Sequence, residues 1–127
     1  MYLNCHTYYS LRYGTFSELD LLDLAKENNY DSIVLSDINN TSACLNFILQ
    51  ANLRNIKPVV GIDFRNGAEQ KFVGIAKNNV GFKELNDFMS QHSQHKMLIP
   101  DLAPNFENVF IIYPFEKVLQ LMAFEAD

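Results

Sequence analysis

The clearest signal for the fold lies in residues 32–37, Ser32-Ile33-Val34-Leu35-Ser36-Asp37. The apolar run at their centre is β-branched and too short for a helix, which is typical of a strand covered on both faces. A similar run, Pro58-Val59-Val60-Gly61-Ile62-Asp63, follows further on. Between them, apolar residues recur with helical period at Cys44, Phe47, Ile48 and Ala51. Two strands joined by a crossover helix predict a parallel pair.

The flanking segments extend this pattern in both directions. Upstream, Ser17-Glu18-Leu19-Asp20 predicts a capped helix that ends near Asn28, and residues 2–6 predict a short strand. Downstream, Arg65-Asn66-Gly67 predicts a β-hairpin that leads into a strand over residues 71–76. This hairpin is the one antiparallel feature that we expect.

The last third of the chain continues with a helix, a strand and a helix. A helical pattern covers residues 81–93. Pro100 and Pro104 then interrupt regular secondary structure, and residues 109–113 predict a strand. Helical spacing returns from Phe115 to Met122. The predicted fold class is therefore α/β: a mostly parallel sheet with crossover helices and one β-hairpin, open or curling toward a barrel.

The length of 127 residues, 48% of them apolar, suits one domain over residues 1–127. The final helical pattern is barely complete at Asp127, so we expect an N-terminal fragment of a longer chain. Such a fragment would leave strand edges and apolar helix faces uncovered, which predicts self-association.

Charge and composition limit the partners. The net charge is −5 and the ten Lys and Arg residues are scattered, so we expect no strong direct binding of nucleic acid by this part. No apolar stretch is long enough to span a membrane, and the N-terminus lacks a signal-peptide pattern. Cys5 and Cys44 fit buried thiols better than a disulfide, and together these features predict a cytoplasmic protein.

Three side chains stand where predicted strands end: His6, Asp37 and Asp63. In parallel α/β folds the carboxyl ends of strands form the site, and imidazole and carboxylate groups are metal-ligand types. These residues are therefore candidate metal ligands. The alternative from composition is structural: Asp37 caps the following turn, Asp63 ends its strand, and His6 is a hydrogen-bonded histidine at the edge.

Four blocks of sequence resemble one known family, in order and spacing. His6-Thr7-Tyr8-Tyr9-Ser10-Leu11, residues 35–40 and residues 56–64 resemble the opening motifs of the PHP (polymerase and histidinol phosphatase) domain. Ala76-Lys77-Asn78-Asn79, followed by residues 81–85, resembles the continuation found in bacterial replicative DNA polymerases, the DNA polymerase III alpha subunits. The resemblance implies the first part of a distorted TIM-like barrel.

The resemblance also implies a metal site, from which this sequence departs. Active members carry a His-x-His pair, an Asp-His pair and a Glu that help to hold divalent metals for phosphate-ester hydrolysis. Here Asn4 and Ile38 stand in place of two histidines, and Asp63 stands in place of the glutamate. We therefore interpret His6, Asp37 and Asp63 as vestigial metal ligands, and we expect no cofactor for this part of the chain.

Two functions follow from the resemblance. The first is a non-catalytic module of a DNA-directed DNA polymerase that supports the remainder of the alpha subunit and docks partners such as the proofreading exonuclease subunit. The alternative is a metal-dependent phosphoesterase or 3′–5′ exonuclease that uses zinc, manganese or magnesium with a non-standard ligand set. An unrelated phosphate-binding domain has no support, because the chain has no G-x-x-x-x-G-K-[ST] loop.

Overall fold

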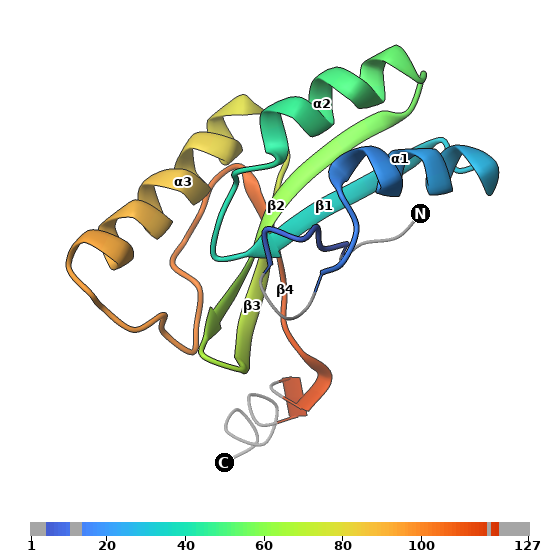
Figure 1. The fold of residues 1–127 in the computed structure, drawn as a ribbon. Coiled ribbons are helices and arrows are strands. Elements are labelled where there is room, and N and C mark those ends of the chain that lie inside the picture. The colour runs from blue at the N-terminus through green and yellow to red at the C-terminus, as the bar shows by residue number, and fades with distance from the viewer. Residues whose placement is uncertain (1–4, 11–13, 117, 120–127) are drawn as a thin grey trace.

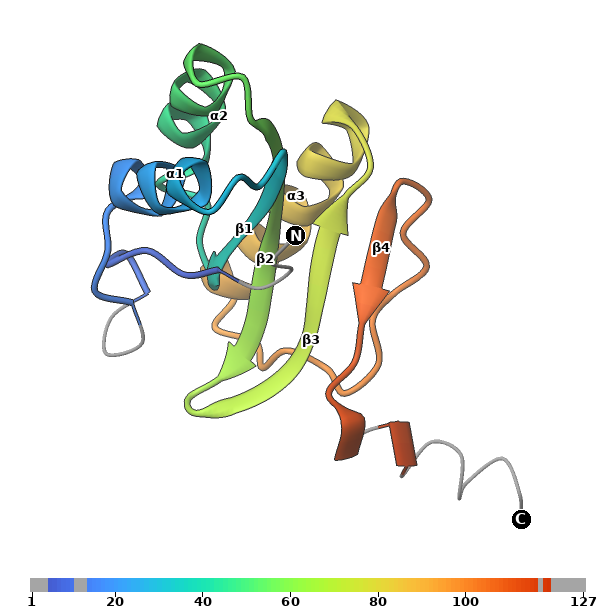
Figure 2. The ribbon, with the colours of Figure 1, turned by 90° about the vertical axis from the view of Figure 1, so that its right-hand side faces the viewer.

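The computed structural model describes residues 5–10, 14–116 and 118–119. One sheet has the strand order β1-β2-β3-β4, as Figure 2 shows. The strands are β1 (Ser32–Ile38), β2 (Lys57–Asn66), β3 (Glu69–Ala76) and β4 (Val109–Ile112). The helices α1 (Glu18–Glu27), α2 (Cys44–Leu53) and α3 (Asn79–Gln94) lie on one side of this sheet (Figure 1). The predicted α/β class is confirmed.

Helix α1 begins where the sequence predicts. The Ser17 hydroxyl accepts a hydrogen bond from the Asp20 amide at 3.1 Å, and the Asp20 carboxylate accepts one from the Ser17 amide at 3.2 Å. This reciprocal capping box satisfies two of the amide groups that a helix leaves unpaired at its start. Leu21, Leu22 and Ala25 then face the core.

The parallel pair is also as predicted. Strands β1 and β2 align from Ser32 opposite Lys57 to Ile38 opposite Asp63, and α2 forms the crossover between them. Phe47 and Ala51 of α2 are fully buried against the sheet. Burial raises the pKa of the Cys44 thiol to about 12, with a smaller contribution from the negative charge of Asp37.

The remainder of the sheet is mixed rather than mostly parallel. The predicted hairpin joins β2 to β3, with Gly67 in the left-handed conformation (φ +59°) that its tight turn requires. Strand β4 is also antiparallel to β3, so the hairpin is not the only antiparallel feature. The reason is the segment 95–108, which follows α3 and returns along the sheet before β4 begins (Figure 2).

Alternation along the strands gives the sheet two different faces. One face packs against the helices through Ile33, Leu35, Ile62, Phe64 and Phe72. The opposite face, here called the open face, has no described helix packed on it and carries Val34, Val59, Val73 and Ile75. Among the described residues the sheet is not closed into a barrel.

Two predicted elements lie at the limits of the description. The strand expected over residues 2–6 is represented by a single parallel bridge from Cys5 to Leu35, and residues 1–4 lie outside the described residues. The last expected helix is helical at Phe115, Glu116, Val118 and Leu119, whereas Met122 lies outside the described residues. Neither α1, α2 nor α3 is long and apolar enough to cross a membrane.

Candidate functional site

Two of the three predicted site residues, His6 and Asp63, meet beside the carboxyl end of β1. His6 Nε2 lies 3.0 Å from Asp63 Oδ2, although the two residues are 57 positions apart in the chain. The His6 side chain is 14% exposed and that of Asp63 is completely buried. Asp63 lies opposite Ile38 on β1 and Val73 on β3, so its side chain belongs to the open face.

The Asp63 carboxylate is surrounded by donors. Arg65 approaches it with Nε at 3.2 Å from Oδ1 and Nη2 at 2.9 Å from Oδ2, and Gln70 Nε2 lies 3.1 Å from Oδ1. Burial by itself would raise the pKa of Asp63, but the hydrogen bonds from His6, Arg65 and Gln70 and the charge of Arg65 lower it below the ordinary value. Asp63 is therefore an ionised carboxylate that His6, Arg65 and Gln70 contact.

Asp37 serves a different set of partners. Its Oδ1 accepts hydrogen bonds from the Thr7 amide at 2.6 Å and the Ser10 hydroxyl at 2.7 Å, and its Oδ2 accepts one from the Thr7 hydroxyl at 2.7 Å. Asp37 lies opposite Ile62, which packs toward the helices, so the two carboxylates project from opposite faces of the sheet. Asp37 thus anchors the loop that follows His6.

Ile38 occupies the position beside Asp63. The register places Ile38 directly opposite Asp63, on the same face. An imidazole at this position would stand opposite Asp63, whereas an isoleucine offers no ligand atom. Within residues 5–10, 14–116 and 118–119, no group of three or more His, Cys, Asp and Glu side chains is placed to hold a metal ion. In this arrangement the described residues do not fit a metal centre.

Sequence reasoning missed the residues that complete the site. The sequence pattern predicts Arg65 only as part of the hairpin turn and predicts no role for Gln70. It includes Thr7 and Ser10 only in a block that resembles the PHP domain. One signal was available for Arg65: it stands two residues after Asp63, which places both side chains on one face if the strand continues. The predicted strand ended at Asp63, whereas β2 extends to Asn66.

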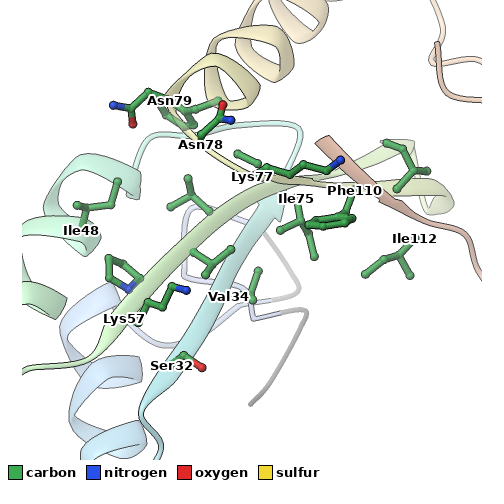
Figure 3. A pocket seen from close by; sticks show the side chains of 16 residues that line it. Ser32, Val34, Ile48, Lys57, Ile75, Lys77, Asn78, Asn79, Phe110 and Ile112 are labelled. Atoms are coloured by element: carbon green, nitrogen blue, oxygen red, sulfur yellow. The ribbon is translucent and has the colours of Figure 1, made fainter. Parts of the chain in front are cut away.

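A cavity in the described part of the chain lies away from this site. This cavity of about 830 Å³ is lined by open-face residues such as Val34, Val59 and Ile75, together with Phe110 and Ile112 of β4 (Figure 3). It reaches Ser32 and Lys57, at the amino ends of β1 and β2, and includes neither His6, Asp37 nor Asp63. Its walls are mainly apolar, with Lys57 and Lys77 as the charged groups, so it resembles uncovered sheet surface more than a catalytic pocket.

Comparison with known families decides the affiliation of the chain. The model of the PHP domain matches residues 3–123. The chain belongs to the PHP domain family. This PHP domain is 30% identical over 110 residues to DNA polymerase III subunit alpha of Ureaplasma parvum serovar 3, and the alignment covers 87% of this chain and 11% of the relative. It is 32% identical over 122 residues to the same subunit of Staphylococcus aureus (strain COL), covering 92% of this chain and 11% of the relative.

A solved structure supports the fold. An amidohydrolase from Chromobacterium violaceum, determined with bound sulfate and no metal, superposes with a TM-score of 0.57 at 18% identity and covers 74% of this chain and 33% of that chain. At this identity the likeness shows the fold alone. The PHP domain described here therefore has a PHP-type α/β fold and is similar over most of its length to DNA polymerase III alpha subunits, of which it spans 11% of the length.

Proposed function

We propose that this PHP domain is the N-terminal module of a cytoplasmic bacterial replicative DNA polymerase, the DNA polymerase III alpha subunit, where it acts in structural support and partner docking. The observation that carries the proposal is the similarity to that subunit over 87–92% of the chain. Polymerase activity would then belong to the remainder of the subunit. The engaged carboxylates of Asp37 and Asp63 support a module whose metal site is eroded.

Helix α2 offers a surface for the docking role. Its inner side buries Cys44, Phe47 and Ala51, yet its outer side carries a second apolar stripe. Leu45, Leu49 and Leu53 are spaced four residues apart and are 75%, 58% and 70% exposed. Three exposed leucines on one helix face form a contiguous apolar patch of the kind that marks protein interfaces.

We expect the triple variant Leu45→Gln, Leu49→Gln, Leu53→Gln, made in the full-length subunit, to weaken a docking interaction. If α2 binds the proofreading exonuclease subunit, the affinity for that subunit should fall about tenfold or more. If α2 instead packs on the remainder of the alpha subunit, solubility or polymerase activity should fall to a comparable extent. Exonuclease binding by calorimetry and primer extension would measure these effects.

The double variant Leu98→Gln, Leu102→Gln is the matched control, since these leucines are also exposed but lie between α3 and β4. Equal behaviour of the two variants would argue against docking through α2. A second test is to delete the whole module from the full-length subunit. If solubility, polymerase activity and exonuclease binding stay normal, the proposed role in structural support and docking is wrong.

The open face predicts self-association of the 127-residue chain. On β4, Phe110 is 60% exposed and Ile112 is 39% exposed, and both line the apolar cavity. We expect dimers or larger species in sedimentation velocity at high protein concentration, and a shift toward monomer in the double variant Phe110→Ser, Ile112→Ser. A strictly monomeric wild-type chain would contradict this prediction.

The competing function is a metal-dependent phosphoesterase or exonuclease that uses His6, Asp37 and Asp63. It requires tightly held zinc, manganese or magnesium, so plasma mass spectrometry of the full-length protein tests it directly. Stoichiometric metal together with manganese-dependent phosphate release, both lost in Asp63→Asn, would favour this function over the module with an eroded site.

A further inference from the structure

Side chains of the described residues fill the acceptor positions of both Asp63 oxygens. Oδ1 is contacted by Arg65 Nε and Gln70 Nε2, and Oδ2 by Arg65 Nη2 and His6 Nε2, all within 3.2 Å. An ionised carboxylate accepts about four hydrogen bonds, so four donors fill its capacity. The Arg65 guanidinium makes a bidentate contact, which combines full charge neutralisation with fixed geometry.

Arg65 is held in this position by its backbone. The Asn39 side chain accepts from the Arg65 amide at 2.9 Å and donates to the Arg65 carbonyl at 2.8 Å. The Asn39 amide also donates to the Asp63 carbonyl at 3.1 Å, and Asn39 adopts a left-handed conformation (φ 53°). Asn39, in the loop that follows Ile38, therefore hydrogen-bonds to the backbone of β2 on both sides of Phe64, at Asp63 and at Arg65.

A β-bulge completes the arrangement. The β2–β3 register shifts between Phe64 and Arg65, so that Phe64 lies opposite Phe72 whereas Arg65 lies opposite Gln70. Lys71 is the extra residue on β3, and its ammonium group pairs with Glu69 and Asp101. Bulges redirect side chains next to functional sites, and this one brings the Gln70 amide to Asp63.

We propose that Arg65 is a built-in cation that takes the place of a divalent metal ion at Asp63, so that this end of the sheet is stable without metal. The inference rests on the proposed function, in which the metal site is lost, and it identifies the residue that compensates for the loss. Without Arg65, the completely buried carboxylate would keep His6 and Gln70 as its polar side-chain partners among the described residues, and an incoming divalent cation would supply the missing charge.

The test is the thermal unfolding of the full-length protein with Mn²⁺ and with EDTA. We expect the wild-type Tm to be the same in both. Arg65→Ala should lower the Tm in EDTA by at least about 5 °C, because a buried charge loses its partner, and Mn²⁺ should restore part of the loss. The double variant Arg65→Ala, Asp63→Asn is the matched control, and its Tm should not respond to Mn²⁺ beyond the wild-type response.

Two results would overturn the proposal. One is a wild-type Tm that rises with Mn²⁺ and loses this response in Asp63→Asn, because a metal would then occupy the site despite Arg65. The other is an Arg65→Ala variant whose Mn²⁺ response equals that of the double variant. If Arg65→Ala does not fold, Arg65→Met is measured in its place, because methionine keeps an aliphatic side chain at this position. The comparison of the wild-type Tm in Mn²⁺ and in EDTA does not depend on either variant. Either of these results would contradict only the role of Arg65 at Asp63. The proposed polymerase module is tested separately, by its binding to partners.

Discussion

Replacing Asp37 by alanine is expected to lower the free energy of unfolding by about 3–5 kcal/mol. The Asp37 carboxylate is 2% exposed and is the acceptor for the Thr7 amide, the Thr7 hydroxyl and the Ser10 hydroxyl. Thr7 and Ser10 are themselves buried, so truncation leaves donors without an acceptor. Each such donor costs roughly 1–3 kcal/mol. Urea denaturation followed by circular dichroism measures the change.

Asp31→Asn is the matched control, since Asp31 is an exposed aspartate just before β1. Its effect should stay within about 0.5 kcal/mol. Asp37→Asn should fall between the two, because an amide keeps one oxygen acceptor and adds donors among groups that already donate. A small effect of Asp37→Ala would mean that the loop after His6 is not anchored by this carboxylate.

Phe64→Ala is expected to destabilise the fold by about 3–5 kcal/mol. Phe64 is completely buried, with its ring centroid 5.0 Å from that of Phe72 and 5.3 Å from that of Phe88 in an edge-on contact. Its neighbours in the chain are Asp63 and Arg65. Because Phe64 faces the helices, it holds those two side chains on the open face, and its truncation should also loosen their ion pair.

The unfolding free energy of Phe64→Ala can be compared with that of Phe16→Ala. Phe16 is 49% exposed, so its loss should cost about 1 kcal/mol or less. Hydrogen exchange of the Asp63 and Arg65 amides would report the local effect. Equal destabilisation by the two variants would argue against an aromatic anchor between the site residues.

Local patterns were sufficient for most of the secondary structure. Three features depend on residues close together in sequence, and local patterns therefore predict them. These are the Ser17 cap, the crossover helix with Cys44 and Phe47, and the turn at Gly67. The family was also accessible from the sequence, because its motifs are ordered blocks. The direction of β4 was not, because it depends on where the segment 95–108 packs after α3.

The local sequence pattern was enough to select His6, Asp37 and Asp63 as candidate site residues, although β2 continues past Asp63 to Asn66. Which of these residues meet depends on how the strands pair in three dimensions. The register that sets Ile38 opposite Asp63 sends Asp37 to the helical face and Asp63 to the open face, and a shift of one residue would reverse this. The bulge then brings Gln70 opposite Arg65, and with it a donor to Asp63. The β1–β2 register depends on how two strands that α2 separates in the chain pack together, which no local pattern encodes. The bulge lies within the β2–β3 hairpin, but the turn signal at Gly67 does not specify it.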